Sequence, residues 1–358
     1  MDAIEVAFRR LHNQRLSGPK LADPVDVVRL LGGVQSQEFG PAKWGVGMRT
    51  ETCRDAEIQR LFDDGAILRT HVLRPTWHFL AAEELGWIQA LTSPRVHVVN
   101  AYYYRMHGID ADFGARSTKL IAAALRGGNH LTRAEMGAAL AASGLEATGN
   151  RLAYIIMVAE LDGVIASGRM RGKQHTYALV SERVAEPVRL TGDAALAELT
   201  RRFFTGHGPA TIKDFAWWSS LTAAQIKRGL DLVGSELCSE QVDGLTVYFA
   251  PSLAPHREPS PTAYALQGYD EYGVAYTESR RVANLAGRVV APPNANMTIQ
   301  PLVLDSQVIG SWRRTVGKRG ITIEPILAAK LTRAQRAACE RSFARFGEFS
   351  GAPVDVRW

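Results

Sequence analysis

Three consecutive stretches of this chain repeat one order of elements, and this repetition constrains the possible folds more than any other feature. Each stretch has a capped helix, a second helix and two short runs of strand-forming residues separated by a turn. A helix-turn-helix followed by a hairpin is typical of a winged helix. We therefore expect an α+β fold with three winged-helix units in tandem. The helix starts are Asp23-Pro24, Thr132 with Glu135 three residues on, Thr211 and Thr222, and the paired strands are 67–73 and 76–80, 164–167 and 176–180, and 237–242 and 246–249.

The C-terminal part follows a different pattern. A loop rich in proline and serine at 251–261 precedes several short β-like runs and a helix over 333–346 that Thr332 caps. Strands at this spacing favour a small barrel or sheet. The runs are 288–290, 297–299, 302–304, 308–312 and 321–323. At 358 residues the chain exceeds a typical single domain, so we divide it into winged helix 1 (1–92), winged helix 2 (93–190), winged helix 3 (191–255) and a β-barrel-like domain (256–358).

Two glutamines one residue apart, Gln35 and Gln37, lie just beyond the first helix and before an expected loop at 39–41. A carboxamide carries an acceptor oxygen and two donor hydrogens and stays neutral at any working pH. Such a pair can hold a water molecule without removing its proton, which suits a reaction whose leaving group is already activated. The structural alternative is that both side chains cap a helix end or face solvent. The spacing alone leaves both interpretations open.

Positive charge is mild overall, with a net charge of +6, but it is clustered. The tip of the second hairpin carries Arg169, Arg171 and Lys173, at the place where a winged helix usually meets a phosphate backbone. Arg313 and Arg314 form a similar cluster near the C-terminus. We interpret these five residues as candidate DNA contacts, and the alternative is a set of ordinary solvated loops.

The first hairpin also carries residues suited to nucleic acid, Arg69, Arg74, Trp77 and His78. Trp77 is either a stacking platform for a displaced base or a core residue. The carboxylates Glu38, Asp270 and Glu271 are candidates for glycosidic chemistry, since that chemistry commonly uses carboxylates. For Asp270-Glu271 we favour a structural role between the third unit and the C-terminal region.

Several classes of protein lose support from what the sequence lacks. Cys53, Cys238 and Cys339 are widely spaced and form no CxxC pair, so neither a zinc site nor a disulfide framework is indicated. No phosphate-binding glycine loop, HExxH or GxSxG motif is present. No signal peptide and no apolar run long enough to span a membrane are visible. We expect a soluble cytoplasmic monomer without membrane partner, metal or cofactor.

Longer motifs now point to one family. The segments 31–38 and 67–79, together with 204–218, 269–272 and 310–314, resemble the AlkZ/YcaQ family of winged-helix DNA glycosylases, in order along most of the chain. The resemblance implies three tandem winged helices, a β-barrel and excision of bulky or cross-linked N7-alkylpurines, which protects antibiotic producers from their own DNA-alkylating products. The family's catalytic motif is Gln, an aliphatic residue and Gln, and a sister branch ends the motif with Asp. Gln35 and Gln37 match it, and Ser36 departs from it.

The chemistry of such a reaction fits the pair of amides. An N7-alkylguanine is cationic, so its glycosidic bond is weakened and the base leaves as a neutral molecule. The enzyme then has to place water near C1′ and stabilise oxocarbenium-like charge. The predicted function is therefore a monofunctional DNA glycosylase that acts on double-stranded DNA carrying alkylated purines. The rival is a non-catalytic winged-helix regulator, which would need a recognition helix rich in base-reading side chains, whereas the helix over 221–233 has few.

Overall fold

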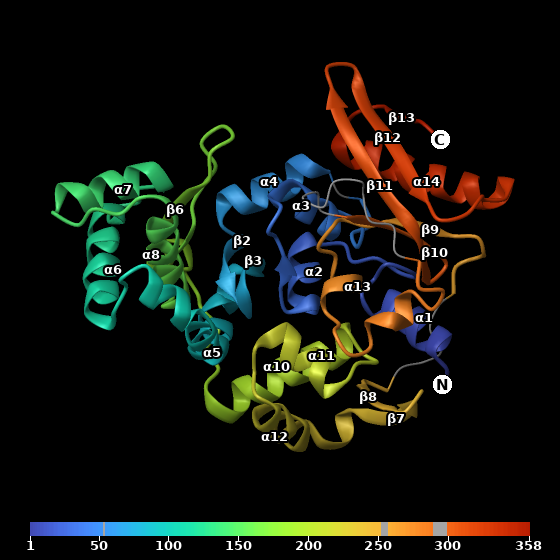
Figure 1. Cartoon of the computed structure of the whole chain (residues 1–358), viewed down its shortest axis with the longest axis horizontal. Coiled ribbons are helices and arrows are strands. Elements are labelled where there is room, and N and C mark those ends of the chain that lie inside the picture. Colours follow the sequence, from blue (N-terminus) through green and yellow to red (C-terminus); the bar gives the residue numbers. More distant parts are fainter. Residues whose placement is uncertain (53, 252–256, 289–298) are drawn as a thin grey trace.

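The computed structural model describes residues 1–52, 54–251, 257–288 and 299–358. It has a mixed α+β fold, elongated, with a helical lobe at one end and a C-terminal sheet at the other (Figure 1). Three successive parts of the chain, called the first, second and third units, cover residues 24–81, 111–179 and 192–249. Each unit has the order helix, short extended segment, two helices, hairpin, and in each the extended segment pairs with the last strand of the hairpin.

The first unit follows a separate helix, α1 (Ala3–Asn13). Asp23 caps α2 and Gly32 ends it, as the sequence predicted. The loop expected at 39–41 is wrong, because α3 begins at Phe39. Pro41 fits there, since backbone N–H groups in the first helical turn have no partner within the helix. The remaining elements are α2 (Pro24–Leu31), β1 (Val34–Gln35), α3 (Phe39–Gly47), α4 (Asp55–Asp64), β2 (Ile67–Val72) and β3 (Arg74–Ala81), and the sheet order is β1-β3-β2.

The second unit is reached through η1 (Ala82–Glu84) and the long helix α5 (Leu85–Met106). A domain boundary between residues 92 and 93 would therefore cut a continuous helix. The capping box of Thr132 and Glu135 is confirmed. The elements are α6 (Ala111–Leu125), β4 (Leu131–Thr132), α7 (Arg133–Ala142), α8 (Gly149–Leu161), β5 (Ile165–Ser167) and β6 (Thr176–Leu179), with sheet order β4-β6-β5.

The third unit repeats the pattern with a single isolated bridge, Ala210 to Tyr248, in place of a first strand. The predicted helix starts at Thr211 and Thr222 are confirmed, and both residues form capping boxes. The elements from residue 180 onward are α9 (Val180–Arg183), α10 (Gly192–Gly206), α11 (Ile212–Ser219), α12 (Ala223–Val233), η2 (Gly234–Glu236), β7 (Cys238–Val242) and β8 (Leu245–Phe249).

The C-terminal part is a curled half-barrel, so the expected β-barrel is correct only in part. Its five strands run in the order β13-β12-β11-β10-β9, and the two outer strands do not pair with each other. The strands expected at 288–290 and 297–299 fall largely outside the described residues. The elements are β9 (Ala263–Ala265), α13 (Glu271–Val274), η3 (Arg280–Ala283), β10 (Gln300–Leu304), β11 (Gln307–Gly317), β12 (Gly320–Leu327), α14 (Arg333–Ser350) and β13 (Val354–Val356).

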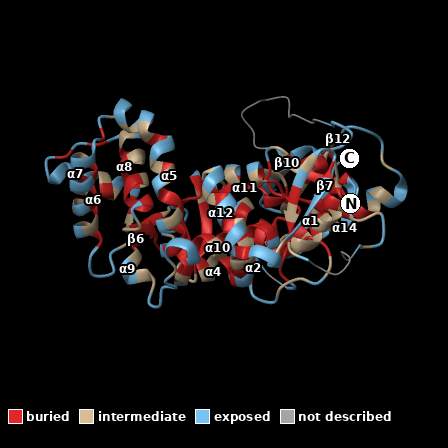
Figure 2. Ribbon diagram, turned by 90° about the horizontal axis from the view of Figure 1, so that it is seen from below, coloured by how far each residue is buried: buried red, intermediate tan, exposed pale blue. Residues whose placement is uncertain are grey.

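One hydrophobic core joins the first unit to the C-terminal sheet, and Figure 2 shows buried residues continuing between these parts. Trp44 is at its centre: the indole lies 5.2 Å from the rings of Phe346 and Phe349, and its Nε1 donates to the Ala265 carbonyl at 2.8 Å. The helical lobe, which is the second unit, has a separate core. The segment that carries the glutamines is thus attached to a rigid platform rather than to an independent domain.

Across the part of the chain that the structure describes, no helix is both long and apolar enough to cross a membrane.

Candidate active site

Gln35 is the more strongly held of the two glutamines. It lies in β1, which pairs with β3 so that Gln35 faces His78 across the ladder, and it is 6% exposed. Gly33 allows the turn into this strand, because its φ of 142° disfavours any other residue. The Gln35 Oε1 accepts a hydrogen bond of 2.8 Å from Arg74 Nη2. A guanidinium only donates, so the amide oxygen faces Arg74 and the amide NH₂ is directed away from it.

Gln37 is the exposed member of the pair. Its Oε1 lies 3.5 Å from the backbone N–H of Trp77, and its backbone carbonyl lies 3.4 Å from Arg69 Nη2. Both contacts are long for hydrogen bonds, and only the first involves the side chain. The structure therefore presents one buried, anchored amide and one exposed, weakly held amide, two residues apart.

Ser36 lies between them and is fully buried. Its N–H donates to the Trp77 carbonyl at 2.7 Å, and its own carbonyl accepts from Arg69 Nε at 3.0 Å. Its Oγ has no hydrogen-bond partner among the described residues. The backbone of the segment is thus fixed by β3 and Arg69, while the Ser36 side chain makes no hydrogen bond within the described part of the chain.

Glu271 lies directly beneath Gln35, although 236 residues separate them in the chain. Its Oε1 accepts from the Gln35 N–H at 2.9 Å and its Oε2 from Trp218 Nε1 at 3.0 Å, and His207 Nε2 lies 3.3 Å from the same Oε2. Burial acts to raise the pKa of this carboxyl, but His207, the charge of Arg74 and the Gln35 N–H outweigh it and bring the pKa to about 2. Glu271 is therefore an anchor under the motif that is charged at neutral pH.

The adjacent carboxylate, Asp270, stabilises the packing between the first unit and the C-terminal part of the chain. It forms a two-pronged ion pair with Arg49, at 2.7 and 2.9 Å, and both side chains are almost fully buried. The structural role favoured for the Asp270-Glu271 pair fits Asp270, whereas Glu271 reaches the candidate site itself.

Trp77 is held in a polar network between the first and second units. Its ring lies 4.3 Å from the Arg69 guanidinium carbon and 4.4 Å from the His71 ring. Its Nε1 donates to Glu160 Oε1 at 3.3 Å, and the other Glu160 oxygen lies 2.5 Å from His71 Nδ1. Trp77 remains half-buried, and its backbone N–H lies beside the Gln37 side chain.

Three residues expected to contact DNA are instead buried under the motif. Arg69 and Arg74 are 8% and 7% exposed, and His78 is completely buried. Burial lowers the pKa of Arg69 to about 10, and burial together with the charge of Arg74 lowers that of His78 to about 3. The expectation of a direct contact does not fit these positions, because the two arginines are engaged with the glutamine segment and the neutral His78 has no exposed edge.

The basic tip of the second hairpin lies beside the candidate site. His175 packs edge-on against Phe39, with ring centroids 4.9 Å apart, and the Met170 N–H donates to Asp63 of α4. Arg169 and Lys173 are exposed. The third predicted contact, Arg171, is exposed but forms an ion pair of 2.6 Å with Glu135.

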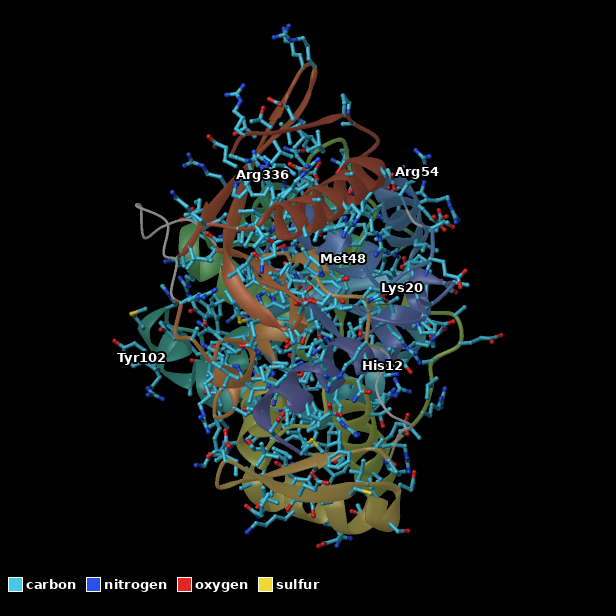
Figure 3. All side chains as sticks on the ribbon, turned by 90° about the vertical axis from the view of Figure 1, so that its right-hand side faces the viewer. His12, Lys20, Met48, Arg54, Tyr102 and Arg336 are labelled. Carbon is cyan, nitrogen blue, oxygen red and sulfur yellow. The ribbon has the colours of Figure 1, made fainter. Side chains whose placement is uncertain are left out.

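A second basic hairpin, β11–β12, projects from the C-terminal sheet (Figure 1, Figure 3). Arg314 is partly buried, donates to Gln300 Oε1 at 2.8 Å and interacts electrostatically with Glu38, the residue after Gln37. Arg313 points to the other face, where it is exposed and paired with Glu324 at 2.8 Å. The structure thus brings Arg314 to the glutamine segment and leaves Arg313 further out on the same strand.

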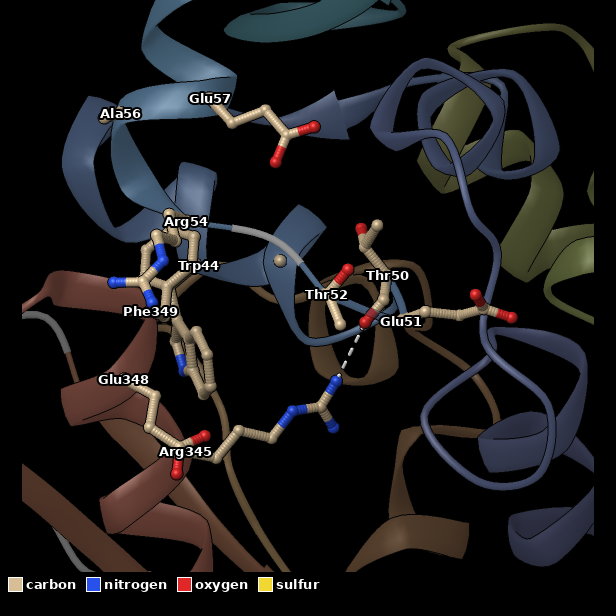
Figure 4. Close-up of a pocket in the computed structure, with 11 residues that line it drawn as sticks. Trp44, Thr50, Glu51, Thr52, Arg54, Ala56, Glu57, Arg345, Glu348 and Phe349 are labelled. Atoms are coloured by element: carbon tan, nitrogen blue, oxygen red, sulfur yellow. Dashed lines mark hydrogen bonds between the residues drawn. The ribbon is translucent and has the colours of Figure 1, made fainter.

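A pocket of about 510 Å³ lies elsewhere, between α3, α4 and α14 (Figure 4). Arg345 crosses it and donates to the Thr50 carbonyl at 3.0 Å. Its lining contains neither Gln35 nor Gln37 and mixes acidic with basic side chains, so we do not assign it to the site. No cluster of three His, Cys, Asp or Glu side chains suited to a metal ion occurs within the described ranges.

A comparison of the sequence with known protein families identifies the class of protein that contains this pair of glutamines. The family description "DNA glycosylase AlkZ-like" matches residues 28–349. The chain therefore belongs to the AlkZ-like family of DNA glycosylases, as the motifs in the sequence predicted.

Two similar proteins come from Streptomyces sahachiroi. The chain is 25% identical over 325 residues to an interstrand DNA cross-link repair glycosylase, with 85% of each chain covered. The structure is similar to that of the S. sahachiroi DNA glycosylase AlkZ, with a TM-score of 0.77, 22% identity and complete coverage of both chains. At 22% identity, the similarity to the AlkZ structure shows a shared fold and no more.

Sequence reasoning missed the residues that hold the motif in place. Glu160 carries no local signal, and His207, although it lies in the segment 204–218, carries no signal for its role, because each acts on a residue more than 60 positions away. Glu271 and Trp218 lie in motifs that the sequence singles out, but their contacts with Gln35 and with each other depend on tertiary packing. Only the presence of those motifs, and not their meeting, was visible in the sequence.

Proposed function

We propose that this chain is a monofunctional DNA glycosylase that hydrolyses the N-glycosidic bond of bulky N7-alkylguanine adducts or interstrand cross-links. The observation that carries the proposal is the pair of neutral amides two residues apart, Gln35 buried and anchored by Arg74 and Gln37 exposed. Family membership and the printed activity of the cross-link repair relative support it. The three repeated units are interpreted as tandem winged helices, a fold that commonly binds duplex DNA.

The reaction needs little acid or base strength from the protein. The cationic base is a good leaving group, so the main tasks are to place a water molecule near C1′ and to stabilise positive charge as it moves onto the sugar. Gln37 is free to accept a hydrogen bond from that water, and Gln35 offers its NH₂ to a second oxygen. In this scheme both catalytic side chains act without changing protonation state, and the protein works as a monomer without metal or cofactor.

Double-stranded DNA would lie across the two basic hairpins. Arg169 and Lys173 on one side and Arg313 and Arg314 on the other are suited to phosphate contacts on either side of the motif. Trp77 offers a partial stacking surface next to Gln37. The proposed biological setting is DNA repair, or self-resistance to a DNA-alkylating natural product.

The decisive experiment is base release from defined duplexes. Oligonucleotides that carry N7-methylguanine, an intercalator–guanine adduct or an N7 cross-link are incubated with excess protein, and free base and abasic sites are measured. The wild type should release the modified base, and Gln35→Ala/Gln37→Ala should bind the same duplex but not cleave the bond. Binding without release by the wild type on every substrate would instead favour the non-catalytic regulator.

A further inference from the structure

The short helix α13 holds both the backbone and the side chain of Gln35, the first directly and the second through Arg74. Its first residue, Glu271, accepts the Gln35 backbone N–H at 2.9 Å. Its last residue, Val274, accepts from Arg74 Nη1 at 3.1 Å, and Arg74 Nη2 donates to the Gln35 side-chain oxygen at 2.8 Å. The backbone and the amide of one catalytic candidate therefore depend on a single helical turn that begins 236 residues later in the chain.

Two consecutive tryptophans of α11 fix α13 in turn. Trp218 Nε1 donates to Glu271 Oε2 at 3.0 Å, and Trp217 Nε1 donates to the Val274 carbonyl at 2.9 Å. Trp217 also lies 5.7 Å from the Arg74 guanidinium carbon. The third unit is thereby connected to the glutamine segment of the first, and α13 is the link between them.

We propose that Arg74 and Glu271 are positioning residues that hold Gln35 in one amide orientation, with its oxygen toward Arg74 and its NH₂ toward the substrate. This inference rests on the proposed glycosylase function. Gln35 then acts as a hydrogen-bond donor to the reacting sugar or water.

The alternative orientation is strongly disfavoured in this setting. A flipped amide would place its NH₂ against the donor-only guanidinium and leave two buried N–H groups facing each other. Leaving a buried polar group without a partner costs about 1–3 kcal/mol. Burial lowers the pKa of Arg74, but a guanidinium stays protonated in proteins, and Glu271 is charged at neutral pH, so the orientation does not depend on a titration near neutrality.

The kinetic test uses Arg74→Met and Arg74→Lys, with Arg202→Met as a matched control. Arg202 pairs with Glu84 and Glu198 and lies 5.4 Å from the Trp87 ring, and among the described residues none of these interactions involves the segment 35–37. Arg74→Met should lower the single-turnover excision rate by about a hundred-fold with adduct affinity nearly unchanged. Arg74→Lys should restore only part of the rate, because an ammonium cannot bridge both the Gln35 oxygen and the Val274 carbonyl.

A second measurement does not depend on activity. In protein with ¹⁵N-labelled glutamine side chains, the Gln35 NH₂ signals are assigned by their loss in Gln35→Ala. Arg74→Met and Glu271→Gln should shift or broaden these signals, and Arg202→Met should leave them unchanged.

The inference is overturned if the Gln35 NH₂ signals are the same in Arg74→Met as in the wild type. It is also overturned if Arg74→Met excises at the wild-type rate, if Arg74→Lys is fully active, or if the control loses activity to the same extent. If the wild type releases no base from any duplex, the proposed function is contradicted rather than this inference. The NMR comparison then still decides whether Arg74 orients Gln35.

Discussion

Replacing Glu271 with glutamine should destabilise the protein in a way that depends on pH. The carboxylate is buried beneath Gln35, and its surroundings lower its pKa from 4.5 to about 2. Each pKa unit corresponds to about 1.4 kcal/mol. The charged form of Glu271 therefore contributes about 3 kcal/mol to the free energy of unfolding at neutral pH.

The sign of the pH dependence follows from the direction of the shift. A carboxyl with a lowered pKa in the folded protein contributes its full stability above the pKa of the unfolded chain, near 4.5. That contribution is lost as the pH falls toward about 2, where the folded protein also takes up the proton. The pH-dependent part of the stability difference between wild type and Glu271→Gln should thus be about 3 kcal/mol at pH 7 and roughly half of that at pH 3.

Urea unfolding of both proteins at several pH values between 7 and 3 measures this difference. Glutamine also changes the hydrogen bonds to Gln35 and Trp218, but that contribution does not vary with pH. The pH-dependent part is the test. A stability difference that stays constant over the range, or that grows as the pH falls, would refute the assignment of Glu271 as a charged anchor.

Other changes near the motif have distinct expected outcomes. Gln37→Glu keeps acceptor oxygens and should retain measurable excision, whereas Gln35→Glu removes the donating NH₂ and should lose about a hundred-fold in single-turnover rate. Ser36→Ala removes a buried unpaired hydroxyl and should raise the free energy of unfolding by about 1 kcal/mol in urea titrations. Lys173→Ala should weaken binding to any duplex and reduce the slope of log Kd against log salt by about one in fluorescence anisotropy. Trp77→Ala should lose about 1–3 kcal/mol of affinity for adducted DNA, and Trp77→Phe less, in the same assay.

The local parts of the fold were predictable because their signals lie within a few residues. Thr132, Thr211, Thr222 and Thr332 all cap helices as predicted, since a capping side chain bonds to a backbone N–H only two or three positions away. The hairpins are recognisable from alternating strand formers and turn residues. The full length of α5 was harder to predict from the sequence, because Pro94 lies inside this helix and a proline normally indicates a helix boundary.

The candidate site was predictable only in its two glutamines. Their neighbours Arg74 and Trp77 were singled out as DNA contacts, and the structure turns Arg74 inward to bind Gln35. The carboxylates Glu160 and Glu271 act across 83 and 236 residues. Hydrophobic periodicity reports which face of an element is buried, but it does not report which buried charges meet when separate units pack together.

The charges beneath Gln35 explain why a pair of amides suits the proposed reaction better than a carboxylate. Arg74 and Glu271 carry opposite charges on either side of this residue, and the adjacent His78 is neutral because its pKa is about 3. A carboxylate at position 35 would pair with Arg74, and any attraction it kept for the cationic base would already be present in the bound substrate. Attraction that is equal in the ground state and the transition state lowers KM without raising kcat. An uncharged amide oxygen on the sugar side, which Gln37 can supply, gains interaction energy as the positive charge leaves the base for the sugar, while the Gln35 NH₂ donates to an oxygen atom rather than to the developing cation.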